Sequence, residues 1–174
     1  MTSIPILHTD RCTLSAITQS DIPVLRQILD DAETQRFLPE LCKEFQTAES
    51  LQQFIVSFDK YLLQDEGILW GIRKGNTLIG FIAIMDIPEE PTLFYAMHPN
   101  FRNKGYMKGC LKKVLEFESG KYWFKNIHTQ VYQENSISLQ LLKFLGFQSY
   151  DMNRQKVCYR LSDTKSRAYK YNQI

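Results

Sequence analysis

The sequence lacks both a long apolar run and a marked excess of charge of one sign. No stretch approaches the roughly 20 apolar residues that a membrane helix needs. The opening MTSIPILHTDR carries an early acid and too short an apolar run for a signal peptide. The 21 basic and 19 acidic residues leave a formal net charge of +2, so no strong field attracts nucleic acid or a membrane surface. We therefore expect a cytoplasmic protein that acts away from membranes and nucleic acid.

Cysteine and histidine are scarce and scattered. No two cysteines form a C-x-x-C pair, and no two histidines have the i, i+4 spacing of a helical ligand pair. These spacings argue against a metal site and against a small disulfide framework. Reduced thiols in the cytoplasm are the simplest interpretation. The residues concerned are Cys12, Cys42, Cys110 and Cys158, and His8, His98 and His128.

What the sequence does contain is the composition of an ordinary globular domain, 44% hydrophobic and 23% charged. A chain of 174 residues is long enough to bury one core, and it contains neither an internal repeat nor a recognisable linker. We predict a single domain over residues 9–162, followed by a polar C-terminal tail at 163–174.

Hydrophobic periodicity predicts an α/β domain with a mixed sheet. Alternating residues predict a first strand over 12–17, and Ser20 is the expected N-cap of a helix with Pro23 in its first turn. A second helix is expected over 47–64, and Gly75-Asn76 is expected to form the turn of a β-hairpin. The remaining strands are expected at 92–99, 127–132, 147–151 and 156–161, and the remaining helices after Gly105 and from Asn135 to Gly146.

The segment HPNFRNKGYMKG places cations and a glycine where a helix begins. The first amides of a helix have no helical partner and lie at the positive end of its dipole, so they can hold an anion. Gly105 allows the backbone to approach a phosphate closely, and Arg102 and Lys104 add charge. The segment therefore predicts a diphosphate site, although a solvated turn explains it equally well.

Two motifs in this order resemble those of the GNAT superfamily of N-acetyltransferases. R-N-K-G-Y-M, at 102–107, resembles the R/Q-x-x-G-x-G/A motif, with Met107 in place of the last small residue. ENSISLQLLKFLGF, at 134–147, resembles the N-x-x-S/A-x-x-L-x-x-x-G-F segment. The N-terminal DRCTLSAITQSDIPVLRQIL is similar to the opening of the ribosomal-protein N-terminal acetyltransferase (RimJ/RimL-like) branch. The resemblance covers residues 9–161.

The resemblance implies a fold and a reaction. The fold is a single-domain, mostly antiparallel central sheet flanked by helices and splayed between its fourth and fifth strands. The reaction is direct attack of a primary amine, on a protein N-terminus or a small molecule, on the thioester of acetyl-CoA. The alternative is a non-catalytic acyl-CoA-binding module. The expected partners are acetyl-CoA and the amine acceptor, with the chain acting as a monomer or a homodimer.

The resemblance also implies which residues hold the cosubstrate. A diphosphate would be held by the amides of a turn with Arg102 nearby, a pantetheine arm would pair with the end of the fourth strand, and Ser138 would lie near the sulfur. The residues implied are Ala96, Met97 and His98 on the strand, Asn103, Lys104, Gly105, Tyr106 and Met107 in the turn, and Asn135 and Ser138 on the following helix.

The catalytic groups are less well defined by this resemblance. The backbone amide near Met97 or His98 would stabilise the oxyanion. Many relatives place a general-acid tyrosine where this sequence has Leu142. That substitution leaves Ser138 as the candidate donor to the sulfur, although its hydroxyl could equally bond the preceding helical turn.

The general base is open. Relatives in this branch often carry an acid where this sequence has Thr92, which cannot act as a base. Asp86, Glu89 and Glu90 are nearby candidates, and solvated loop positions explain them equally well. A peptide α-amine, with a pKa near 8, needs little help beyond water. Segment 37–46, expected to be a loop, is the predicted acceptor contact, since Glu40 and Glu44 suit a cationic amine, although a solvated surface explains them equally well.

Overall fold

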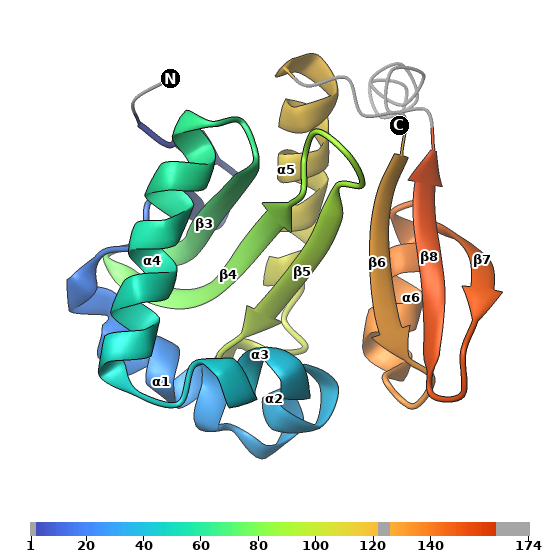
Figure 1. Cartoon of the computed structure of the whole chain (residues 1–174), viewed down its shortest axis with the longest axis horizontal. Helices are drawn as coiled ribbons and strands as arrows, with labels where there is room; N and C mark the ends of the chain where they lie inside the picture. The colour runs from blue at the N-terminus through green and yellow to red at the C-terminus, as the bar shows by residue number, and fades with distance from the viewer. Residues whose placement is uncertain (1–2, 122–125, 163–174) are drawn as a thin grey trace.

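A computed structural model describes residues 3–121 and 126–162 of the chain. These residues form one eight-stranded sheet with the order β1-β2-β3-β4-β5-β6-β8-β7 (Figure 1). Every neighbouring pair is antiparallel except β5 and β6, which are parallel. The strands are β1 (Leu7–His8), β2 (Thr13–Ser15), β3 (Gly67–Lys74), β4 (Thr77–Met85), β5 (Thr92–Met97), β6 (Asn126–Tyr132), β7 (Gln148–Met152) and β8 (Lys156–Ser162). The predicted mixed, mostly antiparallel sheet is confirmed.

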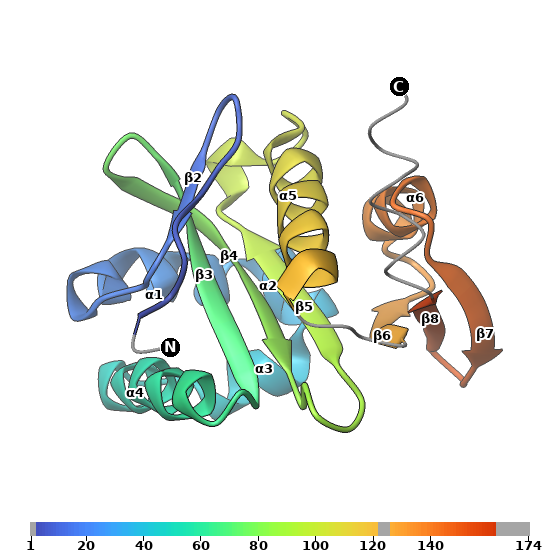
Figure 2. The same ribbon diagram turned by 90° about the horizontal axis from the view of Figure 1, so that it is seen from above.

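Helices cover both faces of the sheet, as Figure 2 shows. One face carries α1 (Ile22–Asp30), α2 (Ala32–Phe37), α3 (Pro39–Glu44) and α4 (Ala48–Leu63), and the other carries α5 (Tyr106–Lys121) and α6 (Ser136–Phe144). Each face has its own buried cluster. Short 3-10 turns, η1 (Gln19–Asp21) and η2 (Pro99–Phe101), precede α1 and follow β5.

Local signals account for the elements that the sequence predicted well. Thr47 caps α4 by accepting a hydrogen bond from the Ser50 amide at 3.1 Å, which satisfies one of the amides at the helix start. Five apolar residues at helical spacing bury one face of α4: Leu51, Phe54, Ile55, Phe58 and Leu62. Gly75 adopts a φ of 58° in the tight turn between β3 and β4, a conformation that glycine adopts without steric cost.

Several predicted boundaries near the N-terminus were wrong. Ser20 is not the N-cap of α1, because it lies inside the 3-10 turn η1 and the N-cap of α1 is Asp21. The strand predicted over 12–17 is only Thr13–Ser15 (β2), with Ala16 exposed beyond it, and a two-residue strand, β1, precedes it. Segment 37–46 is not a loop but the end of α2 followed by α3. Asp31 caps α2, and Pro39 begins α3 with no amide to satisfy.

The sheet opens between β5 and β6. In the described residues a single pair, Thr92 with His128, registers the two strands, and the His128 amide donates to the Pro91 carbonyl at 2.7 Å. Beyond that pair the strands diverge, so that β6, β8 and β7 stand apart from β5 in Figure 1. β1 was not predicted from the sequence, so β5 and β6 are the fourth and fifth predicted strands, and the opening lies where it was expected.

Two findings on the described residues concern membrane helices and metal sites. Across the described residues, no helix is both long enough and apolar enough to cross a bilayer. Within the same residues, no three side chains of His, Cys, Asp or Glu gather where they could hold a metal ion. The predicted polar tail at 163–174 lies outside the described residues.

Candidate functional site

The loop that leaves β5 turns sharply before α5. Asn103 and Gly105 have positive φ angles of 59° and 78°, in the left-handed region that side chains disfavour. The hydrogen bond from the Gly109 amide to the Gly105 carbonyl, at 3.3 Å, belongs to the first turn of α5. The amides of residues 105–108 precede it and face the loop at the positive end of the α5 dipole. This arrangement is suited to an anion.

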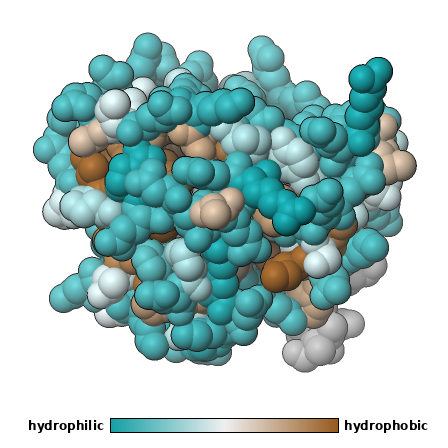
Figure 3. All heavy atoms as spheres, turned by 90° about the horizontal axis from the view of Figure 1, so that it is seen from below, coloured by the Kyte–Doolittle hydropathy of each residue, from teal (hydrophilic) through white to brown (hydrophobic). Residues whose placement is uncertain are grey.

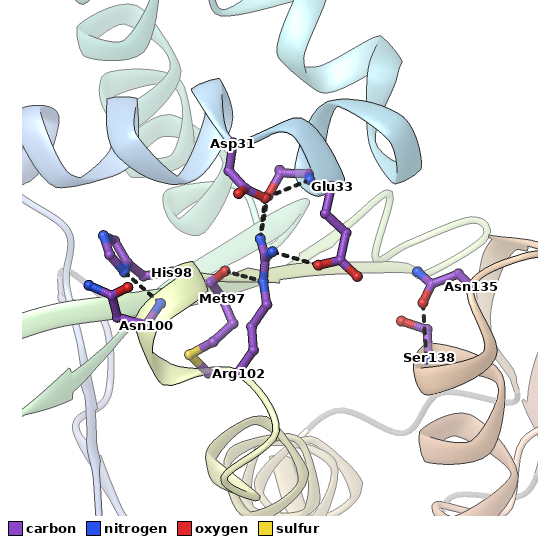
Figure 4. Close-up of polar contacts among 9 residues, drawn as sticks. Asp31, Glu33, Met97, His98, Asn100, Arg102, Asn135 and Ser138 are labelled. Atoms are coloured by element: carbon purple, nitrogen blue, oxygen red, sulfur yellow. Dashed lines mark hydrogen bonds and ion pairs between the residues drawn. The ribbon is translucent and has the colours of Figure 1, made fainter.

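Arg102 is directed away from this loop. Its guanidinium contacts Asp31 Oδ2 and Glu33 Oε2, each at 2.7 Å, and Thr34 Oγ1 at 2.8 Å. Its Nε donates to the Met97 carbonyl at 3.1 Å (Figure 4). Arg102 therefore links the end of β5 to α2. Its charge is paired with the two carboxylates there and does not face the predicted diphosphate site.

Asp31, which accepts hydrogen bonds from Arg102 and Thr34, has a pKa below its usual value. Partial burial on its own would raise the pKa of Asp31, but hydrogen bonds from Arg102 and from the Thr34 amide outweigh burial and lower it. Asp31 is thus held as a carboxylate that serves two structural tasks, capping α2 and anchoring Arg102.

Arg11, which is distant in the sequence, places a cation beside this loop. It was not among the residues predicted for the site. Its Nη1 donates to the Lys104 carbonyl at 2.6 Å, and its guanidinium lies over the Tyr106 ring at 4.1 Å. An ideal Cβ on Gly105 would lie 3.6 Å from the same nitrogen. The contact joins residues 93 positions apart, and no local pattern in the sequence signals it.

Lys104 folds back instead of facing the loop. Its ammonium donates to the Asn100 carbonyl at 2.8 Å and lies 5.7 Å from the Phe101 ring centroid. The predicted contribution of this residue to the site is therefore limited to its backbone in this structure.

The backbone amides of Met97 and His98 point to opposite sides of β5. The His98 amide donates to the Ile79 carbonyl at 2.8 Å, so it continues the ladder to β4. Because successive amides of a strand point in opposite directions, the Met97 amide points toward the opening beside β6. Of the two predicted oxyanion donors, the geometry favours Met97 and excludes His98, whose imidazole contacts Gln27 and the Asn100 amide.

Asn135 and Ser138 approach the same opening from α6. Asn135 caps α6, its Oδ1 accepting the Ser138 amide at 3.2 Å (Figure 4). That oxygen is engaged in capping, and the Nδ2 amide of the same side chain is a further potential donor to a ligand. Leu142, in the position where relatives carry tyrosine, is fully buried in the core.

One pocket of about 240 Å³ joins β5, the loop, α5 and α6. All the predicted cosubstrate residues line it except His98 and Lys104. Tyr95, Glu33 and Lys108 also line it, and sequence reasoning had not selected them. Met107 lines the pocket and packs partly against the core, so its longer side chain occupies space that a small residue would leave open.

The three predicted base candidates lie elsewhere. Asp86, Glu89 and Glu90 are in the turn between β4 and β5, at the opposite end of β5 from Met97, and they do not line the pocket. Glu90 contacts the His128 ring at 3.4 Å. The structure therefore does not bring these carboxylates to the site.

The chain is similar in sequence to acetyltransferases. The family model described as an acetyltransferase (GNAT) domain matches residues 11–148. YoaA of Bacillus subtilis (strain 168), described as an uncharacterized N-acetyltransferase, is 26% identical over 156 residues, which cover 87% of each chain. YokL of the same strain, a prophage-derived protein with the same description, is 28% identical over 141 residues, covering 79% of this chain and 76% of that one.

Solved structures share the fold at low identity. The ribosomal alpha-N-protein acetyltransferase RimL in complex with coenzyme A has a TM-score of 0.82 at 14% identity, covering 92% of this chain and 99% of that one. RimJ of Mycobacterium smegmatis in complex with a CoA disulfide has a TM-score of 0.73 at 12% identity, covering 93% and 90%.

Proposed function

The chain belongs to the GNAT acetyltransferase family, and from that premise we propose that the pocket between β5 and α6 passes the acetyl group of acetyl-CoA to a peptide-like α-amine. The chain is an N-acetyltransferase, and acetyl-CoA is its cosubstrate. The identity of the amine and the residue roles below are the proposal.

The observation that carries the proposal is the opening between β5 and β6, with the Gly105 turn at one end. The strands register only at Thr92 and His128 in the described residues, and the Met97 edge then faces the gap. An extended pantetheine arm fits such an edge as an added strand does. The amides at the start of α5, with Arg11 close by, fit the diphosphate.

Met97 is the proposed oxyanion donor. Its amide points away from β4, and its carbonyl is fixed by the Arg102 Nε at 3.1 Å. A donor held in place before the reaction stabilises developing charge without reorganisation. Arg102 thus supports the chemistry by fixing this peptide group, as a positioning residue.

No uncommitted carboxylate is found among the described residues that line the pocket, and this favours an amine that is already partly neutral. Among the described lining residues Glu33 is the single carboxylate, and Arg102 holds it at 2.7 Å. Without a nearby base, the fraction of neutral amine limits the rate. At pH 7.5 a peptide α-amine is neutral roughly 200 times more often than a lysine side chain. We therefore propose α-amines, rather than lysine, as acceptors.

A second cavity offers the acceptor an approach from the other face. Leu38 lines both cavities, and Phe94 faces the second one beside Tyr95 on β5. Glu40 and Glu44 also line it, and Glu40 pairs with Lys156 at 2.8 Å. The face of the molecule that is seen from below shows apolar patches between hydrophilic side chains (Figure 3). An acidic, aromatic-lined cavity suits the ammonium end of a peptide.

A pair of glycine variants tests the cosubstrate site. Gly105→Asp places a carboxylate beside the proposed diphosphate, and we expect it to weaken CoA binding more than tenfold by calorimetry. Gly75→Asp is the matched control, because Gly75 also has a positive φ, 58°, but lies in the β3–β4 turn with open space around it. Unchanged affinity in Gly105→Asp, or equal losses in both variants, would contradict the site.

Thiol release tests the acceptor class. We expect turnover with a lysine-free peptide that has a free N-terminus. We expect far less turnover with an N-acetylated peptide in which a lysine side chain is the single amine. A preference for the lysine peptide would overturn the α-amine proposal while leaving the cosubstrate site intact.

A further inference from the structure

We propose that Cys12 and Cys110 are a modification site, at which a hydroperoxide oxidises the two thiols to a disulfide that joins the β1–β2 hairpin to α5. All four cysteines of the chain are free thiols in this structure. The proposed modification is separate from acetyl transfer, because neither of the two cysteines lines the pocket between β5 and α6.

The β1–β2 hairpin is docked on α5 in a way that brings the two cysteines together. Strand β1 packs against α5. Arg11, in the turn of the hairpin, donates to the Lys104 carbonyl at 2.6 Å and lies over the Tyr106 ring at 4.1 Å. Cys12 is the next residue after Arg11, and Cys110 is four residues after Tyr106, on the same face of the helix. The docking of the hairpin therefore places Cys12 at Cys110.

The two thiols meet inside the core. Cys12 is 6% exposed and Cys110 is 0% exposed, and both belong to the same buried cluster. One thiol lies within hydrogen-bonding reach of the other, and each affects the pKa of its neighbour. Two groups held in contact react as an intramolecular pair, without the entropy cost of an encounter.

The backbone of Cys12 is fixed by its bonds to Thr9. The Cys12 amide donates to the Thr9 hydroxyl at 2.8 Å. The Cys12 carbonyl accepts from the Thr9 amide at 2.9 Å and from the Thr9 hydroxyl at 3.1 Å. These three bonds close the hairpin turn, so the thiol of Cys12 is presented to α5 by an ordered backbone.

The other two cysteines lie in different surroundings. Cys42 belongs to the buried cluster on the other face of the sheet, and Cys158 is on β8. Burial raises the pKa of both thiols, and the remaining influences on them come from charged residues instead of a second cysteine. Among the four cysteines, all of which the structure describes, Cys12 and Cys110 are thus the pair in contact.

Cys12 is the thiol that meets the oxidant. Burial raises the pKa of Cys12, but Arg11, Lys74 and the neighbouring thiol act in the opposite direction. Burial also raises the pKa of Cys110, and there no cation opposes it. Since the thiolate is the reactive form of cysteine, the more exposed Cys12 reacts first and Cys110 resolves the product.

The oxidation balances in two steps. The Cys12 thiolate attacks one oxygen of hydrogen peroxide, the oxygen–oxygen bond breaks, and Cys12 becomes a sulfenic acid while hydroxide leaves and takes up a proton. The Cys110 sulfur then bonds to the Cys12 sulfur, the sulfur–oxygen bond breaks, and water leaves with the Cys110 proton. Two thiols and one peroxide give one disulfide and two waters.

The disulfide restrains an element at the edge of the fold. Strand β1 is the terminal strand of the sheet, and edge elements open locally at low free energy. A bond from Cys12 to Cys110 closes a loop of about 100 residues, so we expect oxidation to raise Tm by about 5–15 °C. Amide hydrogen exchange over residues 7–15 should slow in the oxidised protein for the same reason.

Peptide mapping of the wild-type protein tests the inference. The native chain is treated with hydrogen peroxide, its remaining thiols are alkylated in denaturant, and it is digested without reductant for mass spectrometry. We expect a peptide that links Cys12 to Cys110, with Cys42 and Cys158 alkylated, and we expect dithiothreitol to remove both the link and the rise in Tm. Oxidation that leaves Cys12 and Cys110 unlinked would overturn the inference, as would thiols that all survive peroxide sufficient to oxidise free cysteine.

A pair of serine variants assigns the rise in Tm. Cys110→Ser removes the resolving thiol, so peroxide should leave its Tm without the increase. Cys158→Ser is the matched control, because it removes a buried thiol and keeps the pair, and it should show the same increase as the wild type. An equal increase in both variants would contradict the assignment. If Cys110→Ser does not fold, the map of the wild-type protein still decides.

The result is independent of the proposed function. A protein that forms the Cys12–Cys110 link but does not bind CoA would contradict the acetyl-transfer proposal alone. A protein that acetylates α-amines but forms no such link would contradict this inference alone.

Discussion

Arg102 provides the sharpest test of how the end of β5 is held. Arg102→Ala removes a guanidinium that is only 20% exposed, together with its bonds to Asp31 and Glu33. It also removes the bonds to the Thr34 hydroxyl and the Met97 carbonyl. Asp31, itself 20% exposed, would lose the partner that compensates its partial burial.

The expected loss follows from the exposure of each bond. Glu33 is 48% exposed, so its ion pair contributes less than about 1 kcal/mol. The more buried charged bond to Asp31 and the bond to Met97 contribute about 1–2 kcal/mol each. We expect Arg102→Ala to lower the free energy of unfolding by about 3 kcal/mol and Tm by about 6–12 °C for a chain of this size.

Thermal unfolding followed by circular dichroism measures this loss, with Arg36→Ala as the control. Arg36 pairs with Glu134, and both side chains are mostly exposed, at 61% and 70%. That variant should therefore lose less than about 1 kcal/mol. Equal losses in the two variants would refute the reasoning. So would a stable Arg102→Ala protein that has lost only CoA affinity, since that outcome returns Arg102 to the diphosphate.

The pH dependence supplies an independent check. The pKa of Asp31 is lowered in the folded state, so its pairing contributes stability above the unfolded pKa, near 3.9. That contribution is lost as pH falls through the folded pKa. The gap between wild type and Arg102→Ala should thus be constant near neutral pH and narrow below about pH 4. A gap that widens in acid would have the wrong sign.

Two further variants test separate parts of the structure. Ser138→Ala should lower kcat about tenfold with little change in the Kd for CoA if its hydroxyl serves the sulfur, and equal turnover would assign Ser138 to helix structure alone. Asp21→Asn should lower the free energy of unfolding by about 3 kcal/mol, because Arg73 grips that carboxylate at 2.7 and 2.9 Å. Its CoA affinity should be unchanged in calorimetry, since the pair lies outside the pocket. Burial alone would raise the pKa of Asp21, but Arg73 and Thr18 lower it, so this stabilisation should likewise disappear below about pH 4.

The sequence predicted the elements whose signals are local. The cap at Thr47 and the turn at Gly75 lie within the elements they define, and both were found. The short helices α2 and α3, of six residues each, were missed because neither is long enough to display a periodic apolar face. Their start signals, Asp31 and Pro39, were in the sequence but were not used.

The residues that line the pocket were predicted by position, but the directions of their side chains were not. Gly105 and Asn135, which both line it, were selected from the two motifs that resemble those of the GNAT superfamily. The direction of Arg102 depends on Asp31, 71 residues away, and the distinction between Met97 and His98 depends on the strand register with Ile79. Tyr95 was overlooked because an apolar strand gives no indication that one hydroxyl lies buried beside α6.

The divergence of β5 from β6 has a consequence for the protein before it meets its cosubstrate. In the described residues the two strand edges pair with each other only at Thr92 and His128, and unpaired edges are templates for association with other chains. Under the proposed binding mode a coenzyme arm would cover the β5 edge, and at 100 times its Kd a ligand stabilises a native chain by about 2.7 kcal/mol. The protein without coenzyme is therefore expected to unfold at a lower temperature than the protein saturated with it.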